Sequence, residues 1–436
     1  RDQDTSAKVT LEPDHASLGD PEAGGAIVNT EKYPNSAKAA RTIWLVLLFT
    51  VCPLYAHDSS ENHGPSVAQR CYELGRVWLD SLSEEQQQQA QHGFNDKGDE
   101  EPLFSAIEKR RKWHYLNSIP TVYQRKEGVA FKDMTSEQRI LGHKFVQCGL
   151  SSQGYFKAAN IMIGENVGWE TLPDLGIKES LEFGTIGGSG AYWLAVFGEP
   201  SQDREWQWQL EGHHLALNFT MVGDAVSVTP SFWGSRPTVI LDGMYAGWHL
   251  MGYEKEYSFR LMSSLSESQK KLALINEEVS ENIFTDPNRL DVFDHYEGLA
   301  ATEMSPIQQE MLRDVIREYV ENYEHEIEQE RMAEIESDGI EKIHFAWMGP
   351  TNDVRYPIYF RVHGPSIIIE YVNAVNHGGD SGGVSLDESG NVIPGDHNIP
   401  DSNHIHSVYR RPSGDYGDDL LRAHYLTDPA HLAAVQ

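Results

Sequence analysis

Apolar residues recur along the chain with two different spacings, one typical of helices and one typical of strands. Four short segments place a Ser or Thr three positions before a Gln and directly after an apolar residue. This spacing is typical of a capping box, in which the hydroxyl and the Gln side chain each bond a backbone amide where a helix begins. Helices are therefore predicted to begin at Ser83, Thr135, Ser266 and Ser305.

The segment that follows Ser305 has the clearest helical period. Pro306 occupies the first helical position, where its missing amide costs nothing. Apolar residues then recur at spacings of three and four, and we expect one amphipathic helix that continues through the polar run up to Gly339. Its predicted buried face comprises Leu312, Val315, Ile316, Tyr319, Val320 and Tyr323. The four helix starts fall into two groups, so helical pairs are expected in 66–170 and 245–340.

Between and after these groups the apolar period changes to two. Residues 191–198, 213–234 and 343–371 are rich in aromatic and β-branched side chains, with turns predicted near Gly223 and Gly364. These patterns predict an α+β fold whose antiparallel sheet is built from two distant sequence regions, with helical pairs packed around it. We expect a single domain, because splitting the chain would leave each half of the sheet with an uncovered edge.

The first 56 residues have a different composition. Residues 1–40 are polar, and the segment 41–56 has a basic start, an apolar run and Ala56 before a polar sequence, which is typical of a secretory signal peptide. The apolar run is too short to span a bilayer, so no stable membrane anchor is expected. The sequence thus predicts a secreted protein whose α+β domain occupies 57–436.

Charge and cysteine content narrow the classes of partner and site. Acidic residues outnumber basic ones by 66 to 35, and the formal net charge is −31. A field of this sign repels polyanions, so nucleic acid is not an expected partner. The predicted mature chain keeps Cys71 and Cys148, which are either paired in an oxidising compartment or buried as free thiols.

Histidines are concentrated in two distant stretches. In "EGHHLALNFT", 211–220, strand alternation would place Glu211 and His213 on an apolar face and His214 on a small, polar one. Near the C terminus, His404 and His406 are two apart, so on a strand their rings would project to one side and could reach one metal ion. The alternative is that these histidines are hydrogen-bonded parts of the core.

Two charged residues in apolar surroundings also need partners. Glu370 follows three isoleucines, and burial of its carboxylate requires a metal or a cation such as Arg361. Arg410 lies close after the His-x-His pair, where it could orient a substrate carboxylate or phosphate. Equally, Arg410 could pair with Asp415 or Asp418 and hold the glycine-containing turn.

Several of these stretches resemble the domain of unknown function 3500 family. The resemblance rests on 206–234, 359–371 and 403–421, together with the helical segments "MTSEQR" and "LSSQGY", and extends over about 66–428. It implies one domain in a family of often secreted proteins, and it implies no particular reaction.

Our hypothesis from the sequence is a secreted, metal-dependent enzyme, either a hydrolase or an oxidoreductase. His214, His404, His406 and Glu370 would bind a divalent transition metal (zinc, copper or iron), and Glu211, His213 and Arg410 would serve catalysis. The substrate stays open. The alternative is a secreted binding or structural protein in which the histidines are structural and an aromatic-rich sheet holds an apolar or sugar ligand. The aromatic residues in question are Trp193, Trp206, Trp208 and Trp233.

Overall fold

The computed structural model places the domain in detail but does not describe every residue. All described residues belong to one compact unit. They are 65–98, 108–115, 127–171, 188–240, 244–285, 287, 289, 292–374, 385–386, 392–393 and 403–427. The predicted signal peptide and the segment before it lie outside this part of the chain.

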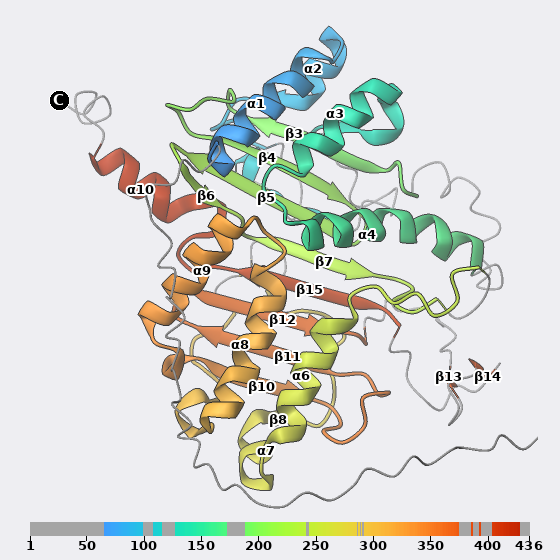
Figure 1. Cartoon of the computed structure of the whole chain (residues 1–436), viewed down its shortest axis with the longest axis vertical. Helices are drawn as coiled ribbons and strands as arrows, with labels where there is room; N and C mark the ends of the chain where they lie inside the picture. Colours follow the sequence, from blue (N-terminus) through green and yellow to red (C-terminus); the bar gives the residue numbers. More distant parts are fainter. Residues whose placement is uncertain are drawn as a thin grey trace, which may run out of the picture. The chain divides into compact units, whose positions relative to one another are not determined.

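One large sheet contains thirteen of the described strands (Figure 1). Its main path is β1 (Gln91–His92), β3 (Tyr192–Phe197), β4 (Trp206–Gly212), β5 (Leu215–Val222), β7 (Ser231–Ser235), β15 (Ile405–Arg410), β12 (Ile367–Val372), β11 (Tyr359–Gly364), β10 (His344–Met348) and β8 (Leu274–Asn276). Three short strands pair beside this path: β2 (Val129–Ala130), β6 (Ala225–Ser227) and β9 (Leu299–Ala300). A separate pair is formed by β13 (Ser385–Leu386) and β14 (Val392–Ile393). The ladder is antiparallel except at β1–β3 and β8–β10.

The helices lie in two groups over one face of this sheet (Figure 1). The first group is α1 (Val67–Asp80), α2 (Glu84–Ala90), α3 (Ser136–Val146) and α4 (Ser152–Thr171). The second is α6 (Gly252–Ser264), α7 (Glu267–Ala273), α8 (Pro306–Val320) and α9 (His325–Asp338), and α10 (Asp418–Thr427) follows β15. The predicted α+β fold, with a mostly antiparallel sheet from two distant regions, is confirmed.

All four predicted capping boxes are present. The hydroxyls at Ser83, Thr135, Ser266 and Ser305 accept from the amide three residues later, and each Gln returns a bond to the cap. The expectation of one helix from Ser305 to Gly339 is wrong, because α8 ends at Val320 and α9 begins at His325. The Glu321 and Asn322 carbonyls at this break accept from Ser151 instead of continuing the helix.

The two halves of the domain repeat one arrangement. In each half a helix pair leads to a short parallel strand, then to a two-residue strand, a second helix pair and an antiparallel meander. Side-chain contacts repeat as well. In the first half, the side-chain amides of Gln86 and Gln138 hydrogen-bond each other, and Gln138 also donates to the Ser81 carbonyl. In the second half, the side-chain amides of Gln269 and Gln308 hydrogen-bond each other, and Gln308 also donates to the Ser264 carbonyl. The halves meet where β7 pairs with β15.

The two faces of the sheet bury different chemistry. The face under the helices is apolar, and Trp206, Trp208 and Trp233 lie fully buried within it. The opposite face includes a smaller apolar cluster that takes in Phe232 and Val408, and buried polar side chains accompany it. The tryptophans proposed as a ligand surface are thus mostly core residues.

Cys71 in α1 and Cys148 after α3 form a disulfide. The sequence left open whether these residues pair or remain free thiols. The bridge closes a separation of 77 residues and joins α1 to the segment between α3 and α4.

Candidate metal centre

The adjacent histidines form a turn instead of part of a strand. Gly212 at the end of β4 pairs with Leu215 at the start of β5, so His213 and His214 are the two residues of a hairpin turn. The expected continuous strand over 211–220 is therefore wrong, and strand alternation does not orient either ring. His214 has φ of 63°, in the left-handed region that costs a non-glycine residue roughly 1–2 kcal/mol. The His214 amide donates to the Tyr115 carbonyl and the Gly234 amide donates to the His214 carbonyl, and these two backbone bonds hold the turn.

His404 and His406 approach this turn from the C-terminal strand. β15 pairs with β7, and His406 lies opposite Gly234. A Cβ atom at position 234 would come within 3.1 Å of the His214 ring and 2.6 Å of the Ile405 carbonyl oxygen. Glycine at this position therefore leaves the space in which the rings meet.

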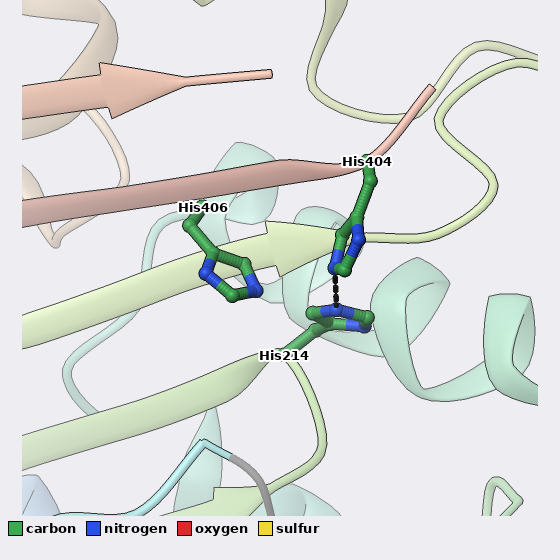
Figure 2. A group of neighbouring side chains, drawn as sticks. All are labelled: His214, His404 and His406. Atoms are coloured by element: carbon green, nitrogen blue, oxygen red, sulfur yellow. Dashed lines mark hydrogen bonds between the residues drawn. The ribbon is translucent and has the colours of Figure 1, made fainter. Parts of the chain in front are cut away.

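The three rings converge in a buried cluster (Figure 2). One nitrogen from each of His214, His404 and His406 lies within 4.8 Å of the others, and all three side chains are buried. The Nε2 atoms of His214 and His404 are 2.8 Å apart. The proposed ligands from two distant regions thus come together, although 190 residues separate His214 from His404.

A carboxylate on α4 fixes the orientation of the turn histidines. Glu165 accepts from Nδ1 of His214 at 3.1 Å and from Nδ1 of His213 at 2.8 Å. Burial alone would raise the pKa of Glu165, but the charge of His213 and the hydrogen bonds from His213 and His214 outweigh burial and lower this pKa to about 2. Glu165 is therefore an ionised acceptor, and it directs the lone pair of His214 Nε2 toward His404.

The third ring is oriented in the same way. Nδ1 of His406 lies 2.8 Å from Oδ1 of Asn282. An amide oxygen accepts only, so His406 carries its proton on Nδ1 and presents Nε2 as the basic nitrogen. Tyr115 and Phe232 contact the His406 ring edge to face.

These donors fit a transition metal with nitrogen ligands. Because His214 Nε2 accepts, His404 Nε2 must donate the proton between them, and a metal would take the place of that proton. Two imidazole nitrogens on one tetrahedral ion lie about 3.3 Å apart, given metal–nitrogen distances of about 2.0–2.1 Å. The separation of His214 from His404 would then open by about half an ångström.

Glu370 and Arg410 lie in other networks. The Glu370 carboxylate accepts from the Phe284 and Thr285 amides, the Thr285 hydroxyl and the Tyr359 hydroxyl. Its direct hydrogen bonds thus come from neutral donors and not from the expected cation, since Arg361 pairs with Glu297. Glu370 does not belong to either group of potential metal ligands among the described residues.

Arg410 is buried within the fold. Its Nε donates to Asp415 at 2.8 Å and one terminal nitrogen donates to the Thr285 carbonyl. This is the pairing with Asp415 that the sequence left as an alternative to a substrate clamp. Glu211 is also fully buried, with Oε2 3.4 Å from Nδ1 of His114, and it does not belong to the histidine group.

Glu165 and Asn282 are the site residues that sequence reasoning missed. Glu165 lies in an apolar helical run, where a single carboxylate is normally solvent-facing and gives no motif. A sequence signal for Glu165 does exist. Lys157, Ile161 and Glu165 follow one another at intervals of four residues, so they lie along one side of α4, and Ile161 on that side is buried.

A family comparison covers the whole of this site. A family model described as a protein of unknown function, DUF3500, matches residues 64–418. The chain belongs to the DUF3500 family. The match includes Glu165 and the three histidines, so the DUF3500 region contains every residue of the candidate centre. No curated protein and no solved structure matches the chain.

Within the part of the chain that the structure describes, none of the helices combines the length and apolar character needed to cross a bilayer.

Proposed function

We propose that this DUF3500 protein is a secreted, metal-dependent enzyme. The observation that carries the proposal is the group of three buried histidines, His214, His404 and His406, whose nitrogens lie within 4.8 Å of one another. A structural role needs only one hydrogen bond per ring, and it gives no reason to converge three rings from two distant segments on one point. A left-handed histidine in the turn adds backbone strain of the kind that clusters at functional sites.

The residues around the three proposed ligands have distinct roles in this proposal. Glu165 and Asn282 accept the Nδ1 protons of His214 and His406, which orients both Nε2 lone pairs. His213 is the partly exposed member, with a side chain 20% exposed and bonded to Glu165, so it is suited to exchange protons with solvent as an acid or base.

The ligand set favours hydrolysis over oxidation. A divalent ion held by three neutral imidazoles keeps its full charge and acts as a strong Lewis acid that lowers the pKa of water. Zinc is the ion that this set suits best. A copper or iron occupant would instead support an oxidoreductase.

Secretion is part of the same proposal. The segment 41–56 has the order of a signal peptide, and the Cys71–Cys148 disulfide suits an oxidising compartment.

Turnover by reconstituted protein tests the proposal. Mature protein loaded with zinc, iron(II) or copper(II) would be assayed against ester, amide and phosphoester substrates and for oxygen consumption. The expected result is metal-dependent turnover that His214→Ala abolishes. Turnover that persists in the metal-free protein would refute the assignment of this site.

A further inference from the structure

A second group of buried charges lies in a pocket that the three histidines of the candidate metal centre do not line. The pocket has a volume of about 680 Å³ and lies between α4, α6 and α8. Lys157 on α4 donates to Glu254 at 2.7 Å and to Glu318 at 2.8 Å, and all three residues line the cavity. None of His214, His404 and His406 lines it.

The charges in this group do not balance. One ammonium serves two carboxylates, and the side chains of Glu254 and Glu318 are only 2% and 6% exposed. A buried charge without a counterion is costly, so the second carboxylate must acquire a proton or a cation. Burial and the neighbouring Glu254 raise the pKa of Glu318 to about 7.

Glu254 also has an unused acceptor. Its Oε1 bonds Lys157, whereas its Oε2 is buried and has no hydrogen-bond partner among the described residues. A carboxylate oxygen accepts strongly, and leaving it unpaired in the interior costs about 1–3 kcal/mol. Since Glu254 lines the cavity, a donor held in the pocket could satisfy this oxygen.

The rest of the lining is largely apolar. Ile161, Leu250 and Met251 are buried parts of the wall, while Phe156 and Tyr253 are 65% and 60% exposed. Exposed aromatic rings beside a buried acidic group are suited to an apolar body attached to a cation, which they can contact through their faces.

Other charged groups in the lining do not reverse this preference. Arg260 and Glu256 are both exposed and opposite in sign. Lys255 carries a positive charge, but its Nζ donates to the Tyr356 carbonyl, and burial lowers its pKa to about 8.

We propose that this pocket binds a small organic ammonium ion with an apolar body, whose N–H groups pair with Glu254 and Glu318. The ligand supplies the second cation that the two carboxylates lack, and its apolar part covers the aromatic wall. This binding does not depend on the metal centre.

Three probes that share one phenethyl group and differ in charge test the proposal on the mature protein. Calorimetry would compare 2-phenylethylammonium with neutral 2-phenylethanol and anionic 3-phenylpropionate, before and after chelation of metal. We expect the ammonium ion to bind at least tenfold more tightly than the alcohol in both states. Equal binding of ammonium and alcohol, tighter binding of the carboxylate, or no binding of any probe would overturn the proposal.

Variants locate the binding group. Glu254→Gln should weaken binding of the ammonium ion at least tenfold and leave binding of the alcohol unchanged. Glu256→Gln is the matched control, because it removes an exposed carboxylate from the same lining and should change binding less than twofold. If Glu254→Gln does not fold, the comparison of the three probes on the wild-type protein still decides the question.

Discussion

Replacement of Glu165 by Gln perturbs the candidate centre without removing a metal ligand. The Glu165 carboxylate accepts from both turn histidines, at 2.8 and 3.1 Å. Glutamine keeps the shape but offers one acceptor and one donor, so it can satisfy only one Nδ1–H. Where its NH₂ group faces His214, the ring must place its proton on Nε2, which is the nitrogen that the metal needs.

The size of this effect follows from one hydrogen bond. A bond to a charged acceptor contributes about 1.5–3 kcal/mol, and only the bond to His214 bears directly on the metal. Loss of such an orienting partner typically weakens metal binding by 10–100-fold, or about 1.4–2.8 kcal/mol. The two values agree, so we expect Glu165→Gln to bind zinc 10–100-fold more weakly.

Competition with a fluorescent zinc chelator would measure the dissociation constants. Glu318→Gln is the control, since it removes a buried carboxylate that does not contact the histidines, and its affinity should remain within about twofold of wild type. An unchanged affinity in a folded Glu165→Gln variant would refute the role assigned to this carboxylate.

Three further predictions concern stability. Replacing Cys71 and Cys148 by Ala should lower the free energy of unfolding, measured by denaturant titration, by about 4.5 kcal/mol. This value corresponds to the entropy lost by the unfolded chain when a bridge closes a separation of 77 residues. A loss below about 1 kcal/mol would contradict the disulfide. Glu370→Gln should cost about 1–3 kcal/mol in the same assay while metal content stays unchanged; loss of metal would show that Glu370 is a ligand. Because the pKa of Glu318 is raised in the folded state to about 7 from 4.5, wild-type stability should fall as pH rises through this window. Glu318→Gln should flatten that dependence in thermal melts, and an unaltered profile would exclude Glu318 as its source.

Local sequence signals predicted much of the fold. Each of the four capping boxes is a segment of five residues that marks the start of a helix. The turns at Gly223 and near Gly364 also formed as expected. These features depend on neighbours in sequence. The break between α8 and α9 was missed because its cause is a contact with Ser151, which lies far away in the chain.

The site was predictable only in part, for the same physical reason. Three of the proposed ligands do cluster, and both the His-x-His pair and the adjacent His213–His214 pair are visible in the sequence, although the turn that holds His214 was not predicted. The partners Glu165 and Asn282 reach them from other elements and have no local motif. Glu370 looked like a candidate ligand because burial of a carboxylate requires partners, and the sequence could not show that backbone amides and hydroxyls supply them.

The metal content of the purified protein decides whether the three histidines form a metal centre. Mature protein made without a histidine tag would be incubated with zinc, desalted and measured by mass spectrometry beside His404→Ala and His363→Ala. His363 is a matched control because it is buried but does not belong to the described ligand groups. We expect about one metal ion per chain in the wild type and in His363→Ala, and only background metal in His404→Ala. Background metal in the folded wild-type protein would contradict the metal centre.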